Sequence, residues 1–82
     1  MKIFVGNLAS HTDEEDVRQA FVLYGAVDRV NIARNSADGS SRGFAFVDMS
    51  VELDGQRAIA KLNTASIHGN LLTVKQAHRK EH

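Results

Sequence analysis

The sequence contains no cysteine, which excludes disulfides, thiolate zinc sites and cysteine nucleophiles. No apolar run approaches the roughly 20 residues that a membrane-spanning helix needs. The first apolar run, Ile3 to Val5, stops at Gly6-Asn7, so no signal peptide is predicted. The four histidines lack ligand spacing, and we expect neither a metal ion nor a cofactor. These absences favour a cytoplasmic protein with no membrane partner.

The chain also has no net charge at pH 7, because its ten acidic and ten basic residues cancel. This balance argues against a polycation that coats nucleic acid indiscriminately. The charges are nevertheless segregated, with an acidic cluster at residues 13–16 and a basic one at residues 78–80. The sequence is therefore compatible with one basic and one acidic surface.

The length of 82 residues is enough for one hydrophobic core and too short for two. Hydrophobic residues make up 43% of the chain, which is typical of a globular domain. We expect a single domain over residues 1–77, followed by a short basic tail over residues 78–82.

Two segments have the apolar stripe of a helix. The first starts with a capping box, in which Thr12 is the expected N-cap and Glu15 follows three residues later. Its stripe consists of Val17, Ala20, Phe21 and Tyr24, all expected in the core. Gly25 is expected to end this helix in a left-handed conformation. The second helix is predicted over residues 51–62, where Gly55 on the buried stripe would let helix and sheet approach closely.

Strands are predicted at residues 2–6, 27–34, 42–49 and 71–76, the last after a turn at residues 68–70. The order is therefore βαββαβ, which predicts an α+β ferredoxin-like sandwich with a four-stranded antiparallel sheet. Right-handed crossovers place both helices on the same face of that sheet. The other face is left open.

Strand alternation assigns the aromatic side chains to the open face. The aliphatic residues on the helix-covered face are Ile3, Val5, Val30, Ile32, Ala45, Val47, Met49, Leu72 and Val74. Phe4, Phe44 and Phe46 then point away from the helices. Exposing these rings to water is unfavourable by about 25 cal/mol per Å² of apolar surface, unless a ligand covers them. Flat rings on a sheet are platforms for unstacked bases, which favours binding of single-stranded nucleic acid.

Two segments of the chain carry a family resemblance. Ile3-Phe4-Val5-Gly6-Asn7-Leu8 resembles the hexamer motif of the RNA recognition motif family. Arg42-Gly43-Phe44-Ala45-Phe46-Val47-Asp48-Met49 resembles its octamer motif except at the last position, where an aromatic residue is usual. The resemblance covers essentially the whole chain and is greatest to small single-domain bacterial members of the cyanobacterial type.

The resemblance implies roles for individual residues. Phe4 and Phe44 would stack on adjacent bases, Phe46 would pack against a sugar, and Arg42 would pair with a phosphate. Further contacts would come from Lys2, Asn31, Thr73 and Lys75 on the same face, and from Gln76, His78 and Arg79 after it. The implied partner is single-stranded RNA, or single-stranded DNA, since contact with the 2′-hydroxyl is not visible in a sequence.

Two alternatives compete with RNA binding. The same face is suited to a protein-interaction module, although the three phenylalanines together with Arg42 favour RNA. Small acylphosphatases share this order of elements, but they need an arginine in the loop after the first strand, and residues 6–11 contain none. We therefore expect no enzymatic activity. Val22 and Leu23 flank the buried helical stripe, so we expect a monomer with at most weak self-association.

Overall fold

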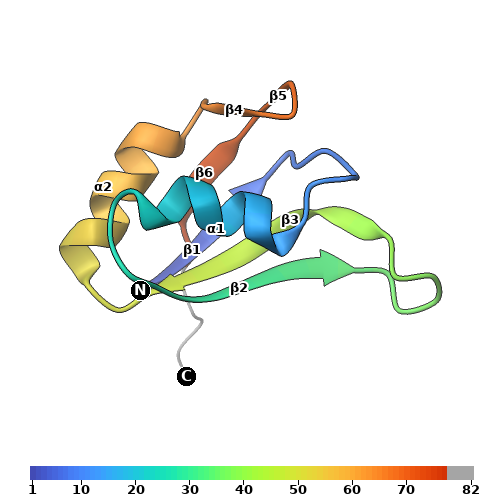
Figure 1. Cartoon of the computed structure of the whole chain (residues 1–82), viewed down its shortest axis with the longest axis horizontal. Coiled ribbons are helices and arrows are strands. Elements are labelled where there is room, and N and C mark those ends of the chain that lie inside the picture. Colours follow the sequence, from blue (N-terminus) through green and yellow to red (C-terminus); the bar gives the residue numbers. More distant parts are fainter. Residues whose placement is uncertain (78–82) are drawn as a thin grey trace.

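The structure is a computed structural model that describes residues 1–77 (Figure 1). The predicted tail, with His78 and Arg79, lies outside the described residues. Along the chain the elements are β1 (Lys2–Gly6), α1 (Glu14–Val22), β2 (Val27–Arg34), β3 (Ser41–Met49), α2 (Glu52–Leu62), β4 (Ser66–Ile67), β5 (Asn70–Leu71) and β6 (Thr73–Gln76). No helix in the described range is long and apolar enough to cross a lipid bilayer.

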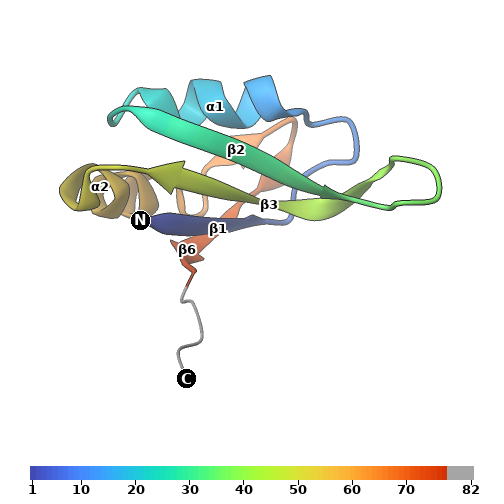
Figure 2. The ribbon, with the colours of Figure 1, turned by 90° about the horizontal axis from the view of Figure 1, so that it is seen from below.

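One antiparallel sheet in the order β2-β3-β1-β6 organises the molecule. Figure 2 shows α1 above β2 on one side of this sheet. Residues of both helices join the sheet in a single core: Val17 and Phe21 of α1, and Ala58 and Leu62 of α2. Both helices therefore pack on one face of the sheet, which confirms the predicted ferredoxin-like fold.

The core contains the aliphatic residues that strand alternation predicts. Ile3, Val5, Ala45, Val47 and Met49 are fully buried. Ile32, Leu72 and Val74 are almost completely buried, while Val30 and Tyr24 are half-buried against the core. Burying these side chains drives the helices onto this face and leaves the opposite face of β1 and β3 uncovered.

Gly55 lies where α2 meets the start of β1. A Cβ atom added at Gly55 would collide with the side chain of Met1 and lie 3.6 Å from Cδ1 of Ile3. Its lack of a side chain therefore allows the close approach of helix and sheet that the sequence predicts.

The start of α1 corrects the predicted cap. Asp13, not Thr12, is the N-cap: its carboxylate accepts a hydrogen bond from the Asp16 N–H at 2.9 Å. The Asp16 carboxylate in turn accepts from the Asp13 N–H at 3.1 Å, so the capping box is shifted by one residue. Thr12 is instead buried, and within residues 1–77 its hydroxyl oxygen has no hydrogen-bond partner. The prediction failed because Asp13 caps as well as threonine does and leaves the Thr12 side chain to pack inward.

The end of α1 also differs from the prediction. The helix ends at Val22 with Leu23 as its C-cap, and Gly25 follows outside it with φ +153°. A Cβ atom at Gly25 would collide with the Asp54 carboxylate of α2. Glycine is required here for this close approach and for its positive φ, and it does not itself end the helix.

The predicted last strand at residues 71–76 begins too early. Leu71 belongs to a hairpin of β4 and β5, whose turn contains His68 and Gly69 with φ values of 51° and 82°. Leu72 then pairs with the chain before this hairpin: its N–H donates to the Ala65 carbonyl, and its carbonyl accepts from the Thr64 N–H, both at 2.8 Å. Of the predicted residues 71–76, only Thr73–Gln76 pairs with β1.

Candidate nucleic-acid interface

Three phenylalanine rings form a compact cluster on the open face of the sheet. In the β1–β3 register Phe4 lies opposite Phe46, and Phe44 lies opposite Gly6. The ring centroids of Phe4 and Phe44 are 5.8 Å apart, with their planes inclined by only 28°. The Phe46 centroid lies 5.9 Å from that of Phe4 and 6.0 Å from that of Phe44, in edge-on arrangements. The three rings are half-buried, so part of each remains available to a ligand.

Each ring has a cation of its own. Nζ of Lys2 lies 5.6 Å from the Phe46 centroid, and Nζ of Lys75 lies 5.5 Å from that of Phe4. Cζ of Arg42 lies 5.6 Å from the centroid of Phe44. A cation over an aromatic face is attracted by the ring quadrupole, which holds these long side chains beside the cluster. The open face thus combines stacking surfaces with positive charge suited to phosphates.

Gly6 shapes this cluster, although the sequence analysis gave it no role at the site. A Cβ atom there would lie 2.7 Å and 2.9 Å from two ring atoms of Phe4, and 3.8 Å from Cβ of Thr73. The glycine therefore provides the space into which the Phe4 ring leans. The signal that could have identified it is its position two residues after Phe4, on the same face of β1.

The predicted polar contacts occupy neighbouring register positions on this face. Asn31 of β2 lies beside Phe46, and Lys75 of β6 lies beside Phe4. Thr73 lies beside Gly6. Gln76 does not join them, because its register partner is Ile3, whose side chain is buried beneath the helices. The side chain of Gln76 therefore projects to the opposite face of the edge strand.

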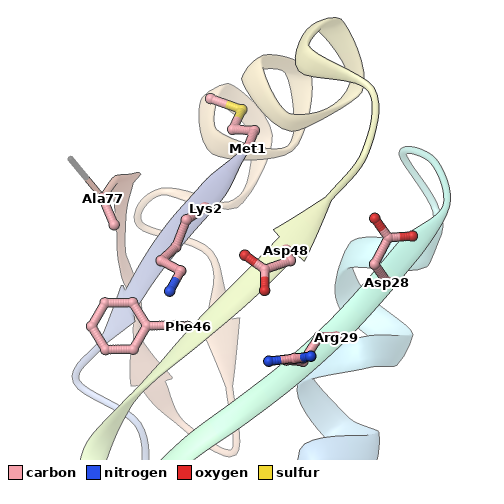
Figure 3. Close-up of a pocket in the computed structure, with 7 residues that line it drawn as sticks. All are labelled: Met1, Lys2, Asp28, Arg29, Phe46, Asp48 and Ala77. Atoms are coloured by element: carbon pink, nitrogen blue, oxygen red, sulfur yellow. The ribbon is translucent and has the colours of Figure 1, made fainter. Parts of the chain in front are cut away.

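Asp48 and Arg29 form a row of charged residues with Lys2 on the same face; the sequence analysis predicted a role for Lys2 but for neither of the other two. Asp48 of β3 is paired in register with Lys2 of β1 on one side and with Arg29 of β2 on the other. These side chains line a hollow next to Phe46 (Figure 3); the other lining residues are Met1, Asp28 and Ala77. Alternation places Arg29 on the face of Asn31 and Asp48 on the face of Phe46, so the sequence pattern could have identified both as candidate contacts.

A known protein family has a sequence pattern that covers the strands and rings of this interface. The sequence pattern of the RNA recognition motif matches residues 3–73, which include all of β3, all but the first residue of β1, and all three phenylalanines. The chain belongs to the RNA recognition motif family. It is 40% identical over 81 residues to RbpF of Nostoc sp., covering 99% of this chain and 77% of RbpF. RbpA of Synechocystis sp. is 36% identical, with 99% of this chain and 80% of RbpA covered. Both relatives are named as RNA-binding proteins.

Solved structures agree with this assignment. The crystal structure of RNA Binding Protein PG1 superposes with a TM-score of 0.93 at 39% identity, covering 100% of this chain and 99% of PG1. A Sex-lethal protein in complex with RNA gives a TM-score of 0.92 at 30% identity, covering 98% of this chain and 48% of that one. The structure in the second comparison was solved as a complex of the related protein with RNA.

A second hollow of this RNA recognition motif lies beside Arg42, and Arg34, Asn35 and Ser36 complete its lining. The side chain of Arg34, at the end of β2, is held by α1 and by the β2–β3 loop, since its guanidinium donates to the Glu14 carboxylate at 2.9 Å and to the Gly39 carbonyl at 3.3 Å. The hydrogen bond from Arg34 lowers the pKa of Glu14 below its usual value. Arg34 thus ties the β2–β3 loop to α1, and Arg42 reaches over the Phe44 ring.

Proposed function

We propose that this chain is a non-catalytic module that binds single-stranded RNA by laying unstacked bases across Phe4, Phe44 and Phe46. The observation that carries the proposal is the ring cluster itself, with three centroids within 6.0 Å of one another and a cation over each ring. The names of its relatives, and the solved complex of a related chain with RNA, support the same ligand class.

The energetics require rings and charges together. Each stacked base contributes roughly 1–3 kcal/mol, so two or three stacks supply about 2–9 kcal/mol before the cost of ordering the strand. Micromolar affinity corresponds to about −8 kcal/mol. Contacts from Arg42 and Lys75 to phosphates would supply the remainder, which makes micromolar binding the expected range. The strand must be single, because paired bases are not free to stack on the protein.

Fluorescence anisotropy of short labelled RNAs, oligouridine and a mixed-sequence pool, tests this proposal. Phe44→Ala removes one stacking ring, and we expect it to weaken binding by about 1–3 kcal/mol while circular dichroism shows a folded protein. Leu23→Ala is the matched control, because Leu23 is 78% exposed at the end of α1, away from the open face. We expect this control to bind RNA as the wild type does.

Two outcomes would contradict the proposal: no binding of either RNA at low salt, or equal losses in Phe44→Ala and Leu23→Ala. The same oligonucleotides made as DNA measure the contribution of the 2′-hydroxyl. A post-transcriptional role in the cytoplasm is the biological context that we propose for such a module.

A further inference from the structure

The charged row on the open face contains an acid where an RNA-binding surface is otherwise cationic. Asp48 is half-buried and lies in register between Lys2 and Arg29. Opposite charges directly across a sheet attract each other. Within residues 1–77, however, neither cation comes within ion-pair distance of Asp48, and no side-chain hydrogen bond engages its carboxylate. Nζ of Lys2 lies over the Phe46 ring instead.

Space for a ligand exists at this carboxylate. The hollow of Figure 3 is bounded by Phe46 on one side and by Asp28 on the other, with Asp48 between them. Lys2 and Arg29 enter it from the two neighbouring strands. A base that rests against Phe46 would therefore present its hydrogen-bonding edge to a carboxylate with two cations beside it.

We propose that this hollow is a guanine-selective site, in which the two oxygens of Asp48 accept hydrogen bonds from N1–H and from the exocyclic amino group of the base. Lys2 or Arg29 then donates to the guanine O6. This inference rests on the proposed RNA binding and adds a base preference to it. It also gives Phe46 a base as its neighbour, in addition to the sugar that the family resemblance implies.

The selectivity follows from the donors on each base edge. An ionised carboxylate only accepts, and its two oxygens take two parallel N–H donors best. Guanine has two adjacent donors on its Watson–Crick edge. Uracil has a single N–H between two carbonyl oxygens, while adenine and cytosine each have an amino group next to an acceptor nitrogen. With these three bases, one carboxylate oxygen would meet an acceptor or remain without a donor.

The carboxylate also disfavours other sequences. A negative charge on a face that binds phosphates repels the strand, and desolvating it without donors is unfavourable. Only a base that supplies those donors offsets this cost. Asp48 therefore selects by penalising the other bases as well as by attracting guanine.

The test uses short oligouridine RNAs that carry one central guanosine, inosine or uridine. Inosine lacks only the exocyclic amino group of guanosine, so it removes one of the two proposed hydrogen bonds. With wild-type protein we expect guanosine to bind about tenfold tighter than inosine. Asp48→Asn is expected to bring this ratio close to one, while it tightens binding of oligouridine because a negative charge is lost.

Asp28→Asn is the matched control, since it removes the same charge from the rim of the same hollow. It is expected to tighten binding of oligouridine and to keep the preference for guanosine. Equal binding of guanosine and inosine strands by the wild type would overturn the guanine site and leave RNA binding intact. A preference that survives Asp48→Asn would overturn the role of Asp48. Failure of every strand to bind would overturn both proposals.

Discussion

At the scale of single residues, the geometry of the interface depends on a position without a side chain. Gly6 lies beneath the Phe4 ring, and a methyl group there would come within 2.9 Å of two ring atoms. Because the ring is the outer end of a side chain, it can tilt away and relieve the contact. Tilting would, however, separate Phe4 from Phe44, whose centroid is 5.8 Å away.

We therefore predict that Gly6→Ala weakens RNA binding by up to the value of one stack, about 1–3 kcal/mol. The cost in stability should stay near the 1 kcal/mol of an average substitution, because the clash lies outside the core. Anisotropy measures the binding loss, and urea unfolding measures the stability. Unchanged affinity in a folded Gly6→Ala protein would show that the position of the Phe4 ring does not matter.

Residues were predictable from sequence where alternation alone decides their side of the sheet. Phe4, Phe44 and Phe46 needed only the opposite, aliphatic side chains to face the helices, and those are buried. The pairing of Asp48 with Arg29 was not predictable in this way. It depends on the β2–β3 register, which runs without a shift from Ile32–Ala45 to Arg29–Asp48 and which local sequence does not specify.

At the scale of elements, α1 begins one residue later than its capping pattern suggests. Asp13 accepts the hydrogen bond from the Asp16 N–H, whereas the hydroxyl of Thr12 is buried with no partner in the described part of the chain. Both residues are good N-caps in isolation. Burial of the Thr12 side chain, a tertiary effect, decides between them.

We predict opposite results for the two positions. Asp13→Ala should destabilise the protein by about 1 kcal/mol, because a free N–H of the first helical turn loses its acceptor. Thr12→Val keeps the shape and removes a buried hydroxyl that lacks a partner, so it should be neutral or stabilising. Urea unfolding of the two variants measures both effects. A larger loss of unfolding free energy for Thr12→Val than for Asp13→Ala would indicate that Thr12, not Asp13, is the N-cap.

The β4–β5 hairpin was missed because its local signals are weak. Each strand has only two residues, and nothing in residues 66–71 alternates over a longer stretch. Long-range contacts hold it in place: the Asn7 amide donates to the Leu71 carbonyl at 2.7 Å, and the Asn70 amide donates to the Asn7 carbonyl at 3.1 Å. His68 adds a contact of 3.0 Å to Asp16. Such partners become evident only once the chain is folded.

At the scale of the whole molecule, the zero net charge conceals a separation. The cations Lys2, Arg42 and Lys75 lie beside the open-face rings. The acidic residues Glu14, Glu15 and Asp16 form the first turn of α1, the helix that covers the other side. The rings thus have cations suited to phosphates beside them, while the first turn of α1 on the other side carries carboxylates that repel phosphates, and this arrangement favours binding of RNA on the open face.

The acidic side also makes stability depend on pH. Hydrogen bonds from the Asp13 N–H and from His68 lower the pKa of Asp16, and the hydrogen bond from Arg34 lowers that of Glu14. Since these pKa values are lower in the folded than in the unfolded chain, the stabilisation is present above the ordinary values of 3.8 and 4.5. It is lost as pH falls through the folded values.

We therefore predict that Tm falls as the pH is lowered from about 6 to about 3. Asp16→Asn should show a smaller fall over this range, because one of the responsible carboxyls is gone. Thermal unfolding followed by circular dichroism at each pH measures both proteins. A wild-type Tm that stays constant or rises on acidification would exclude these carboxylates as a source of stability.

We propose that RNA lies across the open face of the sheet and not against the helices. NMR titration of isotopically labelled protein with short single-stranded RNA distinguishes between these two surfaces. We predict that the amide signals of Phe4, Phe44, Phe46 and Lys75 shift with added RNA, while those of the exposed residues of α1 and α2 stay in place. Shifts concentrated on the helices, or no shifts at protein concentrations well above micromolar, would contradict it.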